Sequence, residues 1–250
     1  MSADKERIDQ LLVENGCVES LKHARALIMA GKVMVNDHRC DKPGQQVSRS
    51  ATLRVKGDDG WASRGAHKLL GVLEAMAWLN DRVEGARCLD VGASTGGFTD
   101  VLLRRGAESV VALDVGYGQL HWRLQKDPRV IVVDRMNIRT LPPGTLPYAP
   151  EVVTCDASFI SMCLILPIIY REMASGGVAM VLVKPQFELP KEDIGPGGIV
   201  RDEGLRAEAL RRVRCCAEEL GFINHGNRDS ILAGPGGNVE ILLVLEKPQD

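Results

Sequence analysis

The sequence has no long hydrophobic run. Among its 250 residues, no stretch of about 18 apolar residues could cross a membrane as a helix. Its first ten residues, MSADKERIDQ, are charged where a secretory signal would be apolar. The composition, 45% hydrophobic and 26% charged, is that of an ordinary soluble protein. We therefore expect a cytoplasmic protein that has no membrane partner.

The sequence also lacks cysteine and histidine spacings that would indicate a metal or a disulfide framework. The number of cysteines is odd, no CxxC pair occurs, and the five histidines are scattered. Most of the cysteines lie in apolar runs, which favours buried, reduced thiols. The cysteines are Cys17, Cys40, Cys88, Cys155, Cys163, Cys215 and Cys216. No metal site is predicted.

Neither common nucleotide fingerprint is present. The glycine-rich stretch LDVGASTGGFTD, residues 89–100, departs from GxGxxG and has no P-loop lysine. Asp114 follows Gly92 by 22 residues, a spacing that suits an acid bonded to ribose hydroxyls. Asp90 would repel a pyrophosphate but attract the ammonium of an amino-acid nucleoside such as S-adenosylmethionine. This favours S-adenosylmethionine over NAD, although the glycines could also serve only a tight turn.

Strand-like runs alternate with helical patterns after residue 63. Continuous β-branched runs between helices predict an α/β fold with a mostly parallel sheet covered on both faces. Helices are expected near 98–105, 161–173 and 204–220. The strand-like runs are CLDVG, SVVALDV, VIVVD, EVVTCD, VAMVLV and VEILLVL.

Four charged residues are expected to meet at the carboxyl edge of this sheet, where ligands of such folds bind. Asp156 follows the run EVVTC, and Lys184 follows VAMVLV just before a proline. Lys68 begins the first helix of the domain, and Glu240 interrupts the last strand-like run. Exposed lysines usually only solvate a surface, but a lysine after a buried strand should emerge near the ligand.

Residues 1–57 carry an excess of positive charge, with ten Lys or Arg and seven Asp or Glu. Two short amphipathic helices are predicted, the second capped by Ser20, followed by a hairpin that turns at Asn36-Asp37. This segment resembles the alpha-L RNA-binding domain through three motifs in this order, RxDxxL, SxxxARxLI and GKVxVN. The resemblance implies RNA contacts, chiefly to phosphate, by Lys22, Arg25, Lys32, Asn36 and Arg39. The alternative is a helix pair whose charges merely face water.

Nearly the whole chain resembles the hemolysin A (TlyA) family through SRGAHK, CLDVGASTGGFTD, ALDVGYGQL, DASFIS, LVKPQFE and GPGGNVE. The resemblance implies an alpha-L domain (1–57), a linker (58–62) and a Rossmann-like, FtsJ-like methyltransferase domain (63–250). It further implies an enzyme that uses S-adenosylmethionine to methylate the 2′-oxygen of a ribose, that of a cytidine, in ribosomal RNA. The partner would be ribosomal RNA or ribosomal subunits. The catalytic tetrad would be Lys68, Asp156, Lys184 and Glu240. The cofactor contacts would be Asp90, Gly92, Ser94, Gly96, Gly97, Asp114 and Asn137.

In the expected mechanism, Lys184 accepts or orients the hydroxyl proton, while Asp156 and Glu240 orient the two amines. The sequence ends with LVLEKPQD, which leaves little room for a further C-terminal helix and favours large-subunit RNA, with small-subunit RNA as a further substrate. Three alternatives remain: a non-catalytic RNA-binding assembly factor, a membrane-lysing hemolysin and a dehydrogenase. No obligate protein partner is indicated.

Overall fold

The computed structural model describes residues 4–15, 17–18, 20–55, 60–234 and 236–249. The chain divides into two compact units. One contains the residues up to Trp61 with His121–Arg123, and the other contains the remaining residues from Ala62 onward. Residues 58 and 59 of the predicted linker lie outside the described part of the chain.

The first unit is a small α+β module whose two helices pack on short strands. Its core is formed by Ile8, Leu11 and Leu12 from the first helix together with Ile28 and Val33. The strands form a two-stranded sheet, β1-β4, and a three-stranded sheet in the order β3-β2-β5. The elements are β1 (Lys5–Arg7), α1 (Ile8–Glu14), α2 (Leu21–Met29), β2 (Val33–Val35), β3 (His38–Cys40), β4 (Gln46–Ser48) and β5 (Leu53–Val55).

Two local predictions for this module are confirmed. The Ser20 side chain accepts a hydrogen bond from the backbone N–H of His23, which caps α2. Asn36 and Asp37 have φ angles of 47° and 64°, as a two-residue hairpin turn between β2 and β3 requires. Asparagine and aspartate tolerate this left-handed conformation better than other non-glycine residues.

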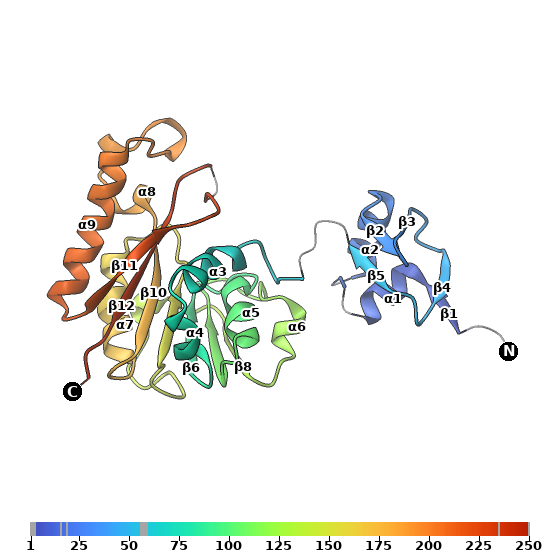
Figure 1. Ribbon diagram of the computed structural model, residues 1–250, viewed down its shortest axis with the longest axis horizontal. Helices are drawn as coiled ribbons and strands as arrows, with labels where there is room; N and C mark the ends of the chain where they lie inside the picture. The colour runs from blue at the N-terminus through green and yellow to red at the C-terminus, as the bar shows by residue number, and fades with distance from the viewer. Residues whose placement is uncertain (1–3, 16, 19, 56–59, 235, 250) are drawn as a thin grey trace. The chain divides into compact units, whose positions relative to one another are not determined.

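The second unit is built on a seven-stranded sheet in the order β11-β12-β10-β9-β6-β7-β8 (Figure 1). The five strands from β10 to β8 pair in parallel, and β12 is antiparallel to both of its neighbours. The predicted mostly parallel sheet is therefore confirmed. The strands are β6 (Arg87–Val91), β7 (Ser109–Leu113), β8 (Val130–Val133), β9 (Val152–Cys155), β10 (Val178–Val183), β11 (Ile223–Asp229) and β12 (Ile241–Glu246).

Helices cover both faces of this sheet. Leu89 and Val91 on β6 point into a core with residues of α7 and α9. The alternate residue Asp90 points to the opposite face, where it contacts Thr99 of α5. The helices are α3 (Ala66–Ala75), α4 (Trp78–Val83), α5 (Gly97–Arg104), α6 (Trp122–Gln125), α7 (Leu166–Glu172), α8 (Pro185–Glu188) and α9 (Glu203–Glu219), with short 3₁₀ turns η1 (Ile138–Thr140), η2 (Met162–Leu164), η3 (Lys191–Asp193) and η4 (Pro196–Gly198).

Three element predictions need correction. The helix expected over 161–173 is divided into η2 and α7, because Pro167 lies in the first turn of α7 and starts a new helix. Strand β11, INHGNRD, was missed because it is polar and lies at the sheet edge. Glu240 does not interrupt a strand, since β12 begins at the next residue.

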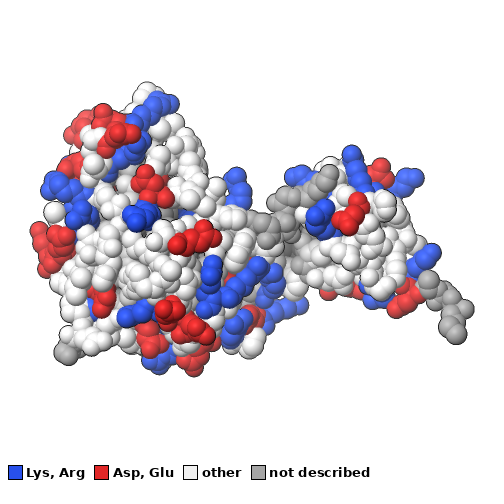
Figure 2. All heavy atoms as spheres, viewed as in Figure 1, with Lys and Arg blue, Asp and Glu red and all other residues white. Residues whose placement is uncertain are grey.

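Charged residues lie on the surfaces of both units. Figure 2 shows Lys and Arg side chains intermixed with Asp and Glu over the visible face of each unit. The strands of the second unit, by contrast, consist mainly of buried apolar residues, and every residue of β10 is buried. In the part of the chain that the structure describes, no helix is long and apolar enough to cross a membrane.

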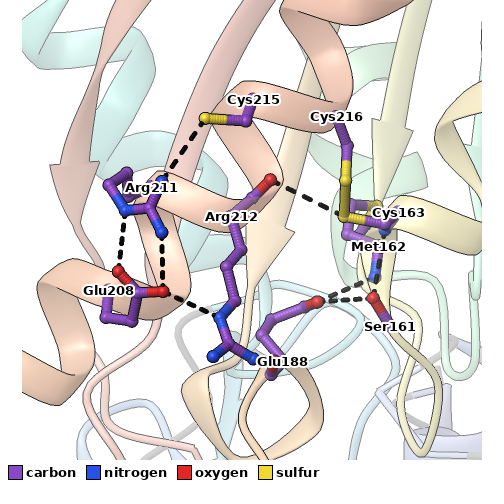
Figure 3. Close-up of a disulfide and its surroundings, with 9 residues drawn as sticks. All are labelled: Ser161, Met162, Cys163, Glu188, Glu208, Arg211, Arg212, Cys215 and Cys216. Carbon is purple, nitrogen blue, oxygen red and sulfur yellow. Dashed lines mark hydrogen bonds and ion pairs between the residues drawn. A yellow bond between two sulfur atoms is a disulfide. The ribbon is translucent and has the colours of Figure 1, made fainter.

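The prediction of seven reduced cysteines is wrong for one pair. Cys163 of η2 and Cys216 of α9 form a disulfide, with a Cα–Cα distance of 5.7 Å (Figure 3). The two residues are 53 positions apart, so only the packing of α9 on η2 brings them together. The other five cysteines form no disulfide, and burial raises the pKa of Cys88 and Cys155 to about 12.

Candidate active site at the carboxyl edge of the sheet

The turn after β6 requires glycine at two positions. Gly92 has a φ of 76°, and a Cβ atom there would lie 2.9 Å from the backbone oxygen of Asp156. Gly96, with a φ of 93°, is the N-cap of α5, and a Cβ atom there would clash with the Leu124 side chain. The predicted glycine turn is therefore confirmed, and it brings the backbone of β6 against the end of β9.

A cavity of about 830 Å³ opens beside this turn. This volume suits a small organic ligand. The carboxyl ends of β6, β7 and β9 and the segment after β8 all contribute to its wall. Its lining includes Gly92, Ser94, Asp114, Asn137, Asp156, Ser158, Phe159, Ser161, Leu164 and Phe187.

Asp114 is held in place at the wall of this cavity. Its carboxylate accepts hydrogen bonds from the backbone N–H groups of Ser94, at 2.8 Å, and Gly116, at 2.7 Å. The first of these bonds links the end of β7 to the glycine turn. Asn137 lies farther along the wall, where its side-chain oxygen accepts from the backbone N–H of Arg139.

Asp90 lies deeper than the sequence suggested. Its side chain is 1% exposed and accepts hydrogen bonds from Thr99 Oγ1 at 2.6 Å and Thr154 Oγ1 at 2.9 Å. Burial outweighs these bonds and raises the pKa of Asp90 to about 6. Asp90 lines a smaller hollow of about 110 Å³ with Gly97 and Asp156. The two threonines were not identified from the sequence.

The four predicted charged side chains converge. Lys184 Nζ lies 2.6 Å from Asp156 Oδ1, and Lys68 Nζ lies 3.2 Å from Asp156 Oδ2. Lys68 Nζ also lies 2.6 Å from Glu240 Oε2. The result is a chain, Lys184–Asp156–Lys68–Glu240, in which basic and acidic side chains alternate.

This chain of charges is shielded from solvent. The side chains of Glu240, Lys184 and Lys68 are 0%, 6% and 11% exposed, and that of Asp156 is 22% exposed. Burial lowers the pKa of Lys68, but Asp156 and Glu240 together outweigh burial, so the pKa is raised overall. Lys68 is therefore held as a cation.

Two neighbours of the cluster were not predicted. Lys184 Nζ donates a hydrogen bond to Ser158 Oγ at 2.7 Å, so its position is set by Ser158 as well as by Asp156. Phe159 has a φ of 64°, is 90% exposed and contacts the ring of Phe187. Neither contact could be predicted from a local pattern, because both depend on how the segments after β9 and β10 meet.

The predicted RNA-binding residues lie in the first unit and fall into two groups. Lys22, Lys32 and Arg39 are exposed. Arg25 is also exposed but forms an ion pair with the fully buried Asp9 at 2.9 Å, and the exposed Asn36 accepts from the backbone N–H of Thr52, just before β5. Arg25 and Asn36 therefore stabilise the module itself, whatever else they contact.

No group of three His, Cys, Asp or Glu residues suitable for a metal occurs among the described residues. The parallel sheet, the glycine turn and the charged cluster at its carboxyl edge together define a Rossmann-like methyltransferase, joined to a small α+β module.

Comparisons with known proteins identify the family. The FtsJ-like methyltransferase model matches residues 61–247, and the S4 domain model matches residues 6–53. The chain belongs to the FtsJ-like methyltransferase family and carries an S4 domain ahead of the methyltransferase domain.

Several relatives match nearly the whole chain. The 16S/23S rRNA (cytidine-2′-O)-methyltransferase TlyA of Mycobacterium tuberculosis is 47% identical over 250 residues, covering 99% of this chain and 92% of the relative. Hemolysin A of Brachyspira hyodysenteriae is 35% identical, covering 94% and 98%. A solved structure of a hemolysin-named protein from Streptococcus thermophilus aligns with a TM-score of 0.72 at 40% identity, covering 100% of this chain and 92% of that one.

Proposed function

We propose that this protein transfers a methyl group from S-adenosylmethionine to the 2′-hydroxyl of a cytidine ribose in ribosomal RNA. One observation carries the proposal: Asp156 and Ser158 hold the Lys184 amine at the wall of the cavity that both of them line. A lysine fixed beside a cofactor-sized cavity suits proton transfer from an alcohol. The substrate follows from the M. tuberculosis relative, which is named for this reaction on 16S and 23S rRNA.

The residues around the cavity fit S-adenosylmethionine. Asp114 presents a carboxylate at the end of β7, where an acid would bond the ribose hydroxyls. Gly92 and Ser94 provide the close backbone approach, and Asn137 would contact the adenosine side of the ligand. Asp90 lies too deep to contact the cavity directly, so we assign it an electrostatic role toward the ammonium.

Bound S-adenosylmethionine would supply an electrophilic methyl group on its sulfonium. The ribose oxygen would take this methyl group as its bond to sulfur breaks, which leaves a neutral thioether, S-adenosylhomocysteine. Lys184, in its amine form, would orient the hydroxyl and accept its proton. Lys68 remains protonated between Asp156 and Glu240, and its contact with Asp156 Oδ2 orients the carboxylate so that Oδ1 faces Lys184. The protein's contribution is chiefly to align the hydroxyl and to accept one proton.

Calorimetry tests the cofactor assignment. We expect S-adenosylmethionine to bind and NAD not to bind. Asp114→Ala should lower the binding free energy by about 1–3 kcal/mol, because hydrogen bonds to a charged acceptor are lost. Glu74→Gln, a change at an exposed carboxylate of α3, serves as the control. Equal affinity in Asp114→Ala and the control would refute the assignment of Asp114.

A further inference from the structure

Two segments that carry the cluster are joined by a series of contacts. Residues 156–162 follow β9, and residues 184–188 follow β10. Asp156 and Ser158 both contact Lys184, and the rings of Phe159 and Phe187 lie 5.3 Å apart. The series ends at Glu188, the last residue of α8, which lies one helical turn beyond Lys184.

Glu188 uses both carboxylate oxygens at the start of η2. Oε2 accepts from Ser161 Oγ at 2.6 Å, and Oε1 accepts from the backbone N–H of Met162 at 2.8 Å. Figure 3 shows the carboxylate pointing at both donors. Burial raises the pKa of Glu188, although these bonds and the charge of Arg212 oppose the rise.

The backbone of Glu188 is anchored from the other side. Its carbonyl oxygen accepts from the Arg212 guanidinium at 3.3 Å, and this guanidinium also bonds Glu208 within α9. The same helix is linked to η2 by the disulfide (Figure 3). Glu188 is thus fixed on α9 while its carboxylate holds the segment that leads back to Ser158 and Asp156.

We propose that Glu188 is a positioning residue for methyl transfer, which acts by fixing residues 156–162 so that Asp156 and Ser158 hold the Lys184 amine. The inference rests on the proposed function, because it assigns Glu188 to the same site. A carboxylate suits this role, since it accepts two hydrogen bonds in a fixed geometry while half-buried. Without it, the donors at Ser161 and Met162 lose their acceptor.

Three variants separate positioning from packing. Glu188→Leu keeps the side-chain volume but removes both acceptors. Glu188→Gln keeps an oxygen for Met162 and an NH₂ group that donates to Ser161, so it should restore most of the activity. Glu192→Gln, at an exposed carboxylate four residues later, is the matched control.

The readouts are the single-turnover rate on ribosomal subunits, the affinity for those subunits, the melting temperature and amide exchange over residues 157–163. We expect Glu188→Leu to lower the rate by about 10- to 100-fold, as a misplaced catalytic group does. Exchange over 157–163 should rise. The melting temperature should fall by no more than a few degrees, because two hydrogen bonds are lost. The affinity for subunits should stay near the control value.

A wild-type rate in a folded Glu188→Leu protein would overturn the inference while the proposed function stands. A Glu188→Gln rate as low as that of Glu188→Leu would also overturn it, because the hydrogen bonds would then not be the cause. If wild-type protein transfers no methyl group to RNA, the proposed function fails first, and the inference fails with it.

Discussion

Asp9 and Asp90 are both buried carboxylates, but their pKa values are shifted in opposite directions. Hydrogen bonds and charge from Arg7 and Arg25 lower the pKa of Asp9 to about 2, so Asp9 stays ionised. The side-chain donors to Asp90 are the hydroxyl groups of Thr99 and Thr154, and burial raises its pKa to about 6. The buried charge of Asp90 therefore reduces the stability of the folded protein at neutral pH, as expected of a residue kept for function.

The variant Asp90→Asn tests whether the buried charge of Asp90 reduces the stability of the folded protein. The folded-state pKa of about 6 lies above the ordinary value of 3.8, so between these pH values the folded state binds more protons than the unfolded state. The unfolding free energy of the wild type should therefore fall by up to about 3 kcal/mol as pH rises through this window. Asp90→Asn should lack that fall in urea unfolding from pH 4 to 7.

Glu74→Gln, at an exposed carboxylate, should keep the wild-type pH dependence. If the unfolding free energy of Asp90→Asn falls with pH as the wild type's does, the fall does not come from Asp90, and the pKa of Asp90 is not raised. Cofactor affinity measured on the same variant then shows separately whether the charge of Asp90 also serves the ligand.

At the scale of elements, the disulfide joins η2 at the cavity wall to α9 on the outside of the sheet. Closing a loop of 53 residues stabilises the folded state by about 4 kcal/mol in the chain-entropy model. Reductant should therefore lower the melting temperature of the wild-type protein by roughly 8 to 16 °C for a unit of this size.

The double variant Cys163→Ser/Cys216→Ser should melt at the lower temperature and show no response to reductant. Cys215→Ser, next to the pair in sequence, should respond as the wild type does. A wild-type protein whose melting is unchanged by reductant, and whose mass shows two free thiols at these positions, would contradict the disulfide.

The elements that position the site could be predicted where hydrophobic patterning determined them. The apolar runs at β6, β7, β9 and β10 predicted strands, and parallel strands bring their carboxyl ends to one edge, so Asp156 and Lys184 were expected to meet. The polar edge strand β11 has no such pattern. Ser158, Glu188 and the disulfide depend on contacts between distant loops, which no local pattern encodes.

At the scale of the whole molecule, the two units have separate tasks in this account. The S4 domain would bind RNA, and the methyltransferase domain would bind the cofactor and carry out the chemistry. Lys22, Lys32 and Arg39 are exposed in the S4 domain, whereas Arg25 is paired with Asp9. Only the first three are suitable for an RNA-binding test, because loss of Arg25 also leaves Asp9 with one partner fewer.

Replacing Lys22, Lys32 and Arg39 together by Ala should weaken binding to ribosomal subunits and flatten its salt dependence. Each lost phosphate contact should lower the slope of log K against log salt by about 0.9. Affinity for S-adenosylmethionine should not change. Lys42→Ala, at another exposed lysine of the same domain, is the control. Unchanged RNA affinity in the triple variant would mean that these charges only face water.

Mapping the methylated product tests whether Lys184 serves 2′-O-methylation of ribosomal RNA. Purified ribosomal subunits without the modification are incubated with S-adenosylmethionine and wild-type protein, Lys184→Ala or Lys184→Arg, and 2′-O-methyl groups are then mapped. We expect one or more new 2′-O-methylcytidines with the wild type. We expect a rate about 100-fold or more lower with both variants, because neither side chain accepts a proton. Methylation elsewhere than a ribose 2′-oxygen, or a wild-type rate in Lys184→Arg, would contradict this expectation.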